Sequence, residues 1–376
     1  MTSQSTDPSP YFVGMDVHKA SITIAVYRGG SSECFEKRMP NDLGKVRRFM
    51  KKLLKEAPVR ACYEASGCGY VLYRALIAIG VDCQVIAPSL VPKRSGDRRK
   101  TDSRDARGLG SLLRAGLLTP IHIPSTEEES LRDLVRYRET MRGEVHRSKQ
   151  HVLKLLLRHG LRSPTAKHWT GPFWTWLRKL ELPGFTGETL QMQIALLSTK
   201  IDQLAAIDRR LEEVWRGDDR LRGPVGRLRC LRGIDTLSAM VLATEIVDIM
   251  RFASPRALMG WLGLTVSEDS SGEVKSYLGI TKTGNARCRR ILVEAAWQYR
   301  HKPAVYKGLA ARQADQSPAV VAHANRAQRR LHRRLRYLQL RKDHRKAVTA
   351  VARELAGFVW AIMHDDPQLL IAQPRP

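Results

Sequence analysis

The chain has 376 residues, which exceeds one ordinary domain and is enough for two or three hydrophobic cores. Its 64 Lys and Arg residues against 37 Asp and Glu residues give a formal net charge of +27, which indicates an anionic partner such as a nucleic acid backbone. No apolar run approaches the roughly 18 residues of a membrane helix, and no signal-peptide pattern precedes the first expected strand. We therefore expect a soluble, cytoplasmic protein that binds no membrane.

The first third of the chain predicts a mixed α/β domain. Two β-rich runs, residues 12–17 and 21–26, are joined by a turn, and "SECFEKRMP" predicts a third strand at an edge. A helix over "DLGKVRRFMKKLLKEA" leads into a strand "VRACYEAS", a helix "GYVLYRALIAIG" and a strand "DCQVIAP", before a last helix that begins near Thr101 or Asp102. This order is that of a ribonuclease-H-like domain, which we expect to span residues 1–124.

Four carboxylates fall at particular places on this pattern. Asp16 lies near the end of the first strand, and Glu64 lies at the end of the fourth. Asp102 and Asp105 are three positions apart and so share one face of the last helix. In a ribonuclease-H-like sheet the first and fourth strands are neighbours, and the last helix packs across the same edge. The four side chains are therefore expected to converge.

Convergent carboxylates repel one another unless a cation neutralises them. Mg²⁺ or Mn²⁺ suits hard oxygen ligands, and two such ions can clamp the attacking and leaving oxygens of a phosphoryl transfer. Each acid also has a plain structural explanation. Asp102 could cap the helix with Asp105 in its first turn, while Glu64 could be a surface residue and Asp16 a turn former. Their joint placement favours the metal site.

Basic residues surround the two aspartates of this last helix. We expect them to hold a phosphate strand while the acids hold the metal. The expected contacts here are Lys93, Arg94, Arg98, Arg99, Lys100 and Arg104.

Residues 125–222 have a different pattern, in which long charged segments carry an apolar stripe. The first segment, from Ser125 to about Arg162, opens with a capping box of Ser125 and Glu128. After a Trp- and Pro-bearing loop, the second segment runs over residues 188–215. The pair predicts an antiparallel or intermolecular coiled coil and a dimer. Two helices of an ordinary helical core are the alternative.

Residues 223–376 predict a mainly helical domain. A helix, a tight turn at Gly233 and a second helix are followed by a Ser-rich loop over residues 267–272 and by a turn-and-helix opening, "TKTGNARCRR". The stretch 325–346 holds ten Lys or Arg residues against one acid, which predicts a helix that contacts phosphates without reading sequence. The expected phosphate contacts of this domain are Lys275, Lys282, Arg287, Arg289, Arg290, Arg329, Arg330, Arg333 and Arg334.

In their order along the chain, several of these motifs resemble the insertion sequence 110 family of transposases, with its 1111, 116 and 902 relatives. The motifs are "GMDVHK", "YEASG", "KTDSRDA" and the late "LGL", "SSG" and "ITKTGNARCRR", and together they cover most of the chain. The resemblance implies an N-terminal RuvC-like domain with a DEDD tetrad, a coiled-coil segment and a C-terminal transposase domain with a nucleophilic serine. It also implies a tetramer guided by a non-coding bridge RNA, which pairs with donor and target DNA.

The family's Ser-Gly pair falls on Ser271 and Gly272. The resemblance therefore implies that Ser271 forms a transient phosphoserine bond to DNA, although Ser270 and Ser267 are alternatives in this chain. A serine hydroxyl needs a base, a metal or electrostatic stabilisation to attack at neutral pH, and no His lies within residues 265–280. The expected metal cluster is then the expected activator, which requires the two domains, from one chain or from neighbouring chains, to meet across the DNA.

Other functions fit parts of the same pattern. A RuvC-like nuclease or Holliday-junction resolvase would use the four acids to activate water and would need no serine. A non-catalytic nucleic-acid-binding protein would tolerate replacement of the acids. An actin-like kinase also begins with an Asp-bearing hairpin, but the chain lacks matching glycine motifs for adenosine and phosphate.

Overall fold

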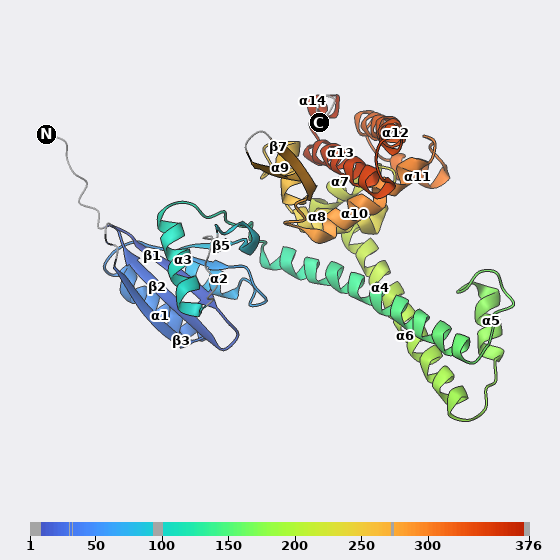
Figure 1. Ribbon diagram of the computed structural model, residues 1–376, viewed down its shortest axis with the longest axis horizontal. Helices are drawn as coiled ribbons and strands as arrows, with labels where there is room; N and C mark the ends of the chain where they lie inside the picture. The colour runs from blue at the N-terminus through green and yellow to red at the C-terminus, as the bar shows by residue number, and fades with distance from the viewer. Residues whose placement is uncertain (1–8, 30, 32, 93–100, 272–273, 372–376) are drawn as a thin grey trace. The chain divides into compact units, whose positions relative to one another are not determined.

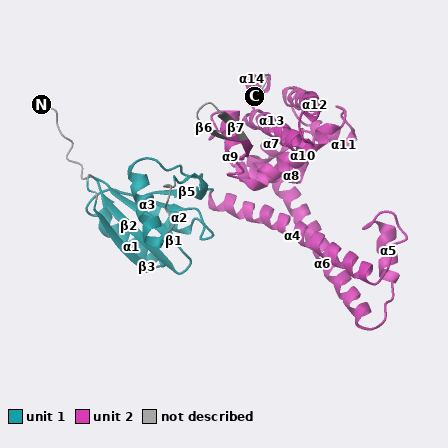
Figure 2. Cartoon of the chain, in the orientation of Figure 1, with its two compact units in different colours: residues 1–124 teal, residues 125–376 magenta. Residues whose placement is uncertain are grey.

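The computed structural model describes residues 9–29, 31, 33–92, 101–271 and 274–371, with the backbone alone for residues 268–271 and 274–277 (Figure 1). The chain forms two compact units, Met1–Pro124 and Ser125–Pro376 (Figure 2). The first is a mixed α/β unit and the second is mainly helical, so the predicted α/β-plus-α class is confirmed. Among the helices that the structure describes, none combines the length and the apolar composition of a membrane span.

A five-stranded mixed sheet forms the centre of the first unit. Its strands are β1 (Tyr11–Val17), β2 (Ser21–Arg28), β3 (Cys34–Pro40), β4 (Val59–Glu64) and β5 (Asp82–Ile86), in the order β3-β2-β1-β4-β5. The first three strands are antiparallel neighbours, whereas β4 runs parallel to both β1 and β5. The predicted adjacency of the first and fourth strands is therefore confirmed.

Helices pack against both faces of this sheet. On one face, α1 (Leu43–Leu54) and α2 (Val71–Ile77) share a core with Val13 and Met15 of β1. On the other face, α3 (Asp102–Arg114) buries Leu109 and Leu113 against β4 and β5. Successive strand residues point to opposite faces, so Asp16 lies on the face of β1 that α3 covers.

The residue that caps the N-terminus of α3 is not one of its two aspartates. The N-cap is Thr101, whose side chain accepts a hydrogen bond from the backbone N–H of Arg104. Asp102 and Asp105 therefore lie inside the helix, and the alternative in which Asp102 is the cap is wrong. Both acids still sit at the end of the helix where the macrodipole favours negative charge.

Glycine at position 14 allows α3 to approach β1 closely. A Cβ atom at Gly14 would lie 2.1 Å from the carbonyl oxygen of Ala106 and 2.3 Å from the backbone nitrogen of Gly110. Both neighbours are backbone atoms, so neither can rotate away. The contact requires glycine, and it fixes α3 against the strand that carries Asp16.

A long helical hairpin begins the second unit. Its helices are α4 (Thr126–Arg158), α5 (Gly171–Lys179) and α6 (Gly184–Gly217), and the predicted capping box of Ser125 and Glu128 is present. Ion pairs join Arg138 to Asp208 at 2.7 Å and Glu144 to Lys200 at 3.2 Å. From the first pair to the second, the residue number rises along α4 and falls along α6, so the two helices are antiparallel within one chain. The expected loop between them contains the short helix α5.

The remaining helices are α7 (Asp219–Leu228), α8 (Thr236–Ile246), α9 (Pro255–Trp261), α10 (Ala286–Ala296), α11 (Lys307–Gln313), α12 (Pro318–Gln339), α13 (His344–His364) and α14 (Pro367–Ile371), and the short 3₁₀ turns are η1 (Pro88–Leu90) in the first unit and η2 (Trp297–Arg300) here. Apart from α11, these helices share one hydrophobic core with the base of the hairpin. The predicted turn between α7 and α8 contains Gly233 at φ +86°. The basic stretch 325–346 divides into two helices, because Asp343 caps α13.

The expected Ser-rich loop is instead a β-hairpin. Its strands are β6 (Val266–Ser271) and β7 (Val274–Ile280), and they are antiparallel. The hairpin leads into α10, whose N-cap is Asn285, as the "TKTGNARCRR" pattern predicts. Gly272 of the predicted Ser-Gly pair lies outside the described residues.

Replacement of Gly14 by Ala should move α3 away from β1. We expect a loss of stability of about 2 kcal/mol, because an added methyl group meets fixed backbone atoms. Hydrogen exchange measured by mass spectrometry should show faster exchange in α3 peptides. The matched control is Gly108→Ala on α3, where no atom lies within 4 Å of the added Cβ and helix propensity improves. Equal protection of α3 in both variants would contradict the proposed constraint.

Candidate functional site

The carboxyl edge of β1 and β4 brings the first two predicted acids to one place. Met15 pairs with Tyr63 across the two parallel strands, so the next residues along each strand are Asp16 and Glu64. Both side chains are partly exposed. Equivalent positions on parallel strands point to the same face, so these two acids share the face that α3 covers.

A histidine joins Asp16 and Asp102 in a compact cluster. The Nε2 atom of His18 lies 3.1 Å from Oδ2 of Asp16 and 3.5 Å from Oδ1 of Asp102. Ligand atoms of these three residues all lie within 4.8 Å of one another. Arg38 approaches the other side of Asp102 at 3.8 Å. We call Asp16, His18 and Asp102 the edge cluster.

His18 was not among the residues predicted from the sequence. Its signal is present in "GMDVHK", because residues two positions apart at the end of a strand point to the same side. The structure shows that its imidazole reaches both aspartates, whereas the sequence assigned this residue only to a turn. The ligand atoms of Glu64 and Asp105 are not part of the edge cluster in the described structure.

The electrostatics of Asp16 favour a bound cation. Burial raises the pKa of its carboxyl group, the neighbouring His18 lowers it, and the negative charges of Asp102 and Asp105 raise it further. The net direction is upward, so the carboxylate form is destabilised in this environment. A divalent cation would reverse that effect, and two carboxylates with one imidazole form a donor set that fits such an ion.

The predicted basic residues beside α3 are only partly described. Lys93, Arg94, Arg98, Arg99 and Lys100 lie outside the described residues. Arg104 is exposed on the first turn of α3, one residue before Asp105. Its role as a phosphate contact stays a prediction.

The candidate serines occupy one strand of the β-hairpin. Ser267 is partly buried, while Ser270 and Ser271 pair through the backbone with Lys275 and Val274 at the far end of β6. Ser271 is therefore the last residue of its strand. Lys282 is exposed where β7 leads towards α10, and it has φ +56°.

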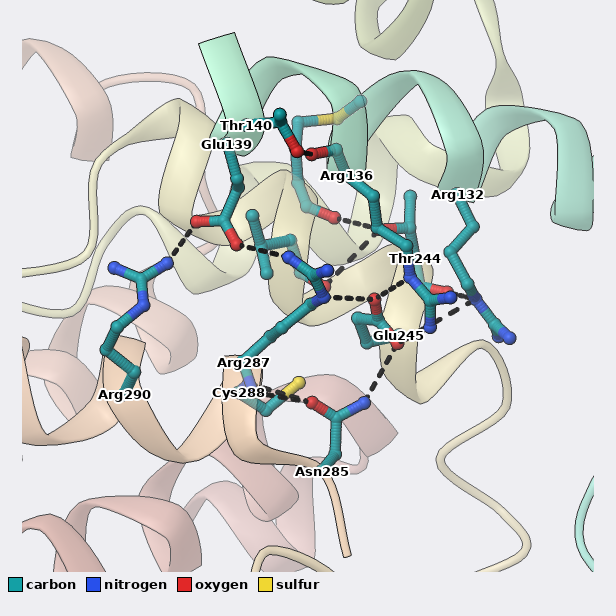
Figure 3. A network of polar contacts seen from close by, with 12 residues as sticks. Arg132, Arg136, Glu139, Thr140, Thr244, Glu245, Asn285, Arg287, Cys288 and Arg290 are labelled. Atoms are coloured by element: carbon teal, nitrogen blue, oxygen red, sulfur yellow. Dashed lines mark hydrogen bonds and ion pairs between the residues drawn. The ribbon is translucent and has the colours of Figure 1, made fainter. Parts of the chain in front are cut away.

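Arg287, Arg289 and Arg290 have partners inside the protein. Figure 3 shows Arg287 and Arg290 of α10 both directed at Glu139 of α4. Arg289 donates to the backbone carbonyls of Leu262 at 2.8 Å and of Thr283 at 2.9 Å. These contacts join α10 to α4 and to the segments that follow α9 and β7. They give the three arginines a structural role alongside the predicted contact with phosphate.

The same network surrounds a buried carboxylate, Glu245, at the end of α8. Arg136 donates to it through Nε at 2.8 Å and Nη2 at 2.9 Å, and the Nδ2 atom of Asn285 donates at 2.8 Å (Figure 3). Burial opposes ionisation of Glu245, but the charge and hydrogen bonds of Arg136, with Asn285 and Arg132, outweigh it and lower its pKa. Glu245 thus links α4, α8 and α10.

The predicted basic helix is α12, and its apolar face is confirmed. Leu331, Leu335 and Leu338 are buried. Arg329, Arg333 and Arg334 are exposed, while Arg330 is half-buried and pairs with Glu354 of α13, which Arg334 also approaches at 3.8 Å. Arg329 and Arg333 form no ion pair with Glu354, so they are better placed to contact a polyanion than the other two.

A mixed sheet with acids gathered at its edge, on a strongly basic chain, is typical of enzymes that act on nucleic acids. Residues 13–160 match a model of DEDD transposases of the IS110 type, and residues 225–310 match the model of the IS116/IS110/IS902 transposase family. Three relatives agree with these matches. The chain belongs to the IS116/IS110/IS902 family and is an insertion-sequence DNA transposase.

The relatives come from three bacterial species. The protein y4qE of Sinorhizobium fredii, provisionally named a transposase, is 40% identical over 95% of this chain and 89% of its own length. The transposase of insertion sequence element IS1533 of Leptospira borgpetersenii is 35% identical over 87% of this chain and 96% of its own. The transposase of element IS1111A of Coxiella burnetii is 22% identical over 80% of this chain and 76% of its own.

Replacement of Glu245 by Gln should destabilise the second unit by about 3 kcal/mol at neutral pH, because it leaves the buried guanidinium of Arg132 and the half-buried one of Arg136 without their anion. The lowered pKa means that this stabilisation is present above the ordinary glutamate pKa of 4.5 and is lost as the pH falls through the folded-state value. The difference between variant and parent should therefore shrink in acid.

Urea unfolding followed by tryptophan fluorescence measures this effect selectively, because all seven Trp residues lie beyond residue 124. The control is Glu213→Gln, whose partner Arg210 forms an exposed ion pair that contributes little. An unchanged midpoint for Glu245→Gln at pH 7 would contradict the structural role.

Proposed function

We propose that this transposase cuts and rejoins DNA strands with an acidic metal site in its first unit and a serine nucleophile in its second. The edge cluster carries the first half of the proposal, because two carboxylates and an imidazole converge beside a strand end with an unfavourable electrostatic environment. The strand order β3-β2-β1-β4-β5 supports assignment of the first unit as a ribonuclease-H-like, RuvC-like domain.

The proposed metal ligands are the tetrad Asp16, Glu64, Asp102 and Asp105, with His18 as an added nitrogen donor. A bound Mg²⁺ or Mn²⁺ would supply Lewis-acid stabilisation of the charge that develops on a phosphodiester during strand cleavage. Asp16 and Asp102 present oxygens from a strand end and from a helix start, two rigid elements. Such elements hold ligands more accurately than loops do.

Ser271 is the proposed nucleophile, with Ser270 and Ser267 as alternatives. Its oxygen would attack phosphorus and displace a deoxyribose oxygen, so that one ester bond forms as another breaks. The phosphoserine link keeps the phosphate in an ester bond, from which a DNA hydroxyl can rejoin the strand. Hydrolysis leaves no such ester bond. The placement of Ser271 as the last residue of β6, paired through its backbone with the first residue of β7, supports the proposal.

Three partners complete the proposal. Donor and target DNA would contact the exposed arginines of α12, and a bridge RNA would guide the choice of sites, as the family resemblance implies. A homo-oligomer, a dimer or tetramer, is supported by apolar side chains that remain exposed near the α5 end of the hairpin. These are Leu157, Phe185, Met192 and Leu196. The proposed setting is the bacterial cytoplasm, where the element's DNA lies.

The division of the second unit into a coiled-coil segment, residues 125–222, and a transposase domain, residues 223–376, also belongs to this proposal. The distal part of the hairpin has a core of its own, which supports the division. The base of the hairpin instead shares the core of the C-terminal helices.

Replacement of Asp102 by Ala should lower Mn²⁺ affinity and strand transfer by about 100-fold or more, since it removes a proposed oxygen ligand. Mn²⁺ binding measured by electron paramagnetic resonance, alongside strand transfer, checks both effects. The control is Asp82→Ala, an exposed acid that pairs with Arg60 at the start of β5. Full recombination by Asp102→Ala, or in excess EDTA, would rule out the metal site.

Replacement of Ser271 by Ala should abolish the covalent protein–DNA adduct without weakening DNA binding. A nicked suicide substrate traps the adduct, and mass spectrometry of the digested protein locates it. Ser270→Ala and Ser267→Ala are the matched controls, and an adduct on either residue would move the assignment. Strand cleavage without an adduct in any variant would favour hydrolysis by the tetrad, the nuclease alternative.

A further inference from the structure

The end of the helical hairpin is basic and lacks acids over a long stretch. We define the hairpin tip as residues 149–180, which include the last turns of α4, the connecting segment and α5. These residues contain no Asp or Glu. The basic side chains of the tip are Lys149, Lys154, Arg158, Arg162, Lys167, Arg178 and Lys179.

In the rest of the hairpin, acidic side chains outnumber basic ones. Six acidic side chains accompany five basic ones over residues 126–148, and seven acidic ones accompany four over residues 181–218. A solvated helix surface ordinarily mixes both signs, as these two segments do. Glu144 and Glu181 are the acids nearest in sequence to the tip, and Glu144 is already paired with Arg147 and Lys200, which lie outside it. The excess therefore belongs to one end of the hairpin.

Aromatic rings lie among these cations. Phe173 is fully buried, and around it the ring centroids of Trp169 and Trp176 lie at 5.0 and 5.6 Å. Trp174 packs edge-on against Trp169 at 5.5 Å. The three indoles are each only partly buried. Three of the chain's seven Trp residues therefore occupy one short segment at the surface.

The cations and the rings form one surface on a rigid base. The side-chain nitrogen of Lys149 lies 5.4 Å from the ring of Trp169, and the guanidinium of Arg178 lies 5.4 Å from the ring of Trp174. Phe173 and Leu177 fasten α5 to a core with Leu155, Leu156 and Leu190 from the two long helices. Charge and aromatic surface are therefore presented together by packed helices.

We propose that the hairpin tip binds unpaired nucleotides of a nucleic acid strand. Cations track the phosphates, and partly exposed indole rings offer faces on which unpaired bases stack. A duplex would use the cations but has no free base faces for the rings. The shared ligand is thus a single strand, either a loop of an RNA or a DNA strand exposed during exchange. This inference does not depend on the metal site or on the serine.

The test uses the full-length protein in EDTA, so that no strand is cleaved. Fluorescence anisotropy measures binding to labelled 15-mers of dT and of U and to a duplex of equal length. In one variant Arg158, Arg162, Lys167 and Lys179 are changed to Gln; all four are exposed. The slope of log affinity against log salt for single strands should fall by about 2 to 3, at roughly 0.7 per lost phosphate contact.

A second variant, Trp174→Leu with Trp176→Leu, keeps apolar packing but removes two stacking faces. It should weaken single-strand binding by about tenfold or more and leave duplex binding unchanged. The matched control changes four exposed arginines near the base of the hairpin, Arg142, Arg209, Arg210 and Arg216, to Gln. It should leave single-strand binding within about twofold of the parent.

Photocrosslinking locates the contact independently. A 5-iodouracil-substituted strand should attach to the tryptic peptide 168–178, "HWTGPFWTWLR", which holds all three indoles. Preference for U over dT would identify an RNA loop, and the reverse would identify a DNA strand; both support the proposal. Parent-like single-strand affinity in both tip variants would overturn it. So would an equal loss of duplex binding in the variant that lacks Trp174 and Trp176, or a change in the tip variants that is confined to the mass of the assembly by light scattering.

Discussion

The geometry of the first unit depends on the absence of a side chain at Gly14. Because backbone atoms of Ala106 and Gly110 fill the space where a Cβ would lie, α3 lies directly against β1. Asp16 is two residues further along the strand, and Asp102 is one helical turn before Ala106. The helix therefore runs opposite to the strand, and its first turn ends beside the strand's last residues. Convergence of the acids follows from this backbone contact.

The environments of two carboxylates, Glu245 and Asp16, shift their pKa values in opposite directions. Glu245 is buried among Arg136, Asn285 and Arg132, and its pKa is lowered in spite of burial, so its charge is compensated within the chain. Asp16 is less buried, yet burial and its acidic neighbours raise its pKa. Arginines of the protein neutralise the charge of Glu245. At Asp16 the nearby His18 does not outweigh burial and the acidic neighbours, so a bound cation would have to supply the positive charge. A shortage of this kind is typical of sites that bind a ligand.

Local patterns were enough to predict the strands of the first unit, the start of α3 and the edge where Asp16 and Asp102 meet. They failed where distant partners decide the outcome. The segment 266–271 is rich in Ser and acidic residues, which suits a loop, but pairing with "VKSYLGI" makes it a strand. Arg287 and Arg290 resemble phosphate contacts because nothing nearby in the sequence reveals Glu139, which lies about 150 residues earlier. The sequence pattern indicates only a turn at His18, because the contact of its imidazole with Asp102 depends on how α3 packs against β1.

A net charge of +27 indicates a polyanionic partner, but it does not say where on the protein that partner binds. Ion pairs within the fold reduce the number of arginines that are candidates for phosphate contacts. An arginine that neutralises a buried or half-buried acid is less available to a phosphate. Arg136, Arg287 and Arg330 are engaged in this way by Glu245, Glu139 and Glu354. Arg329 and Arg333 on α12 and the acid-free end of the hairpin are among the exposed concentrations of positive charge. At the hairpin tip, aromatic rings lie among the cations, so this surface is suited to bases as well as phosphates. The exposed arginines of α12 are suited only to phosphates.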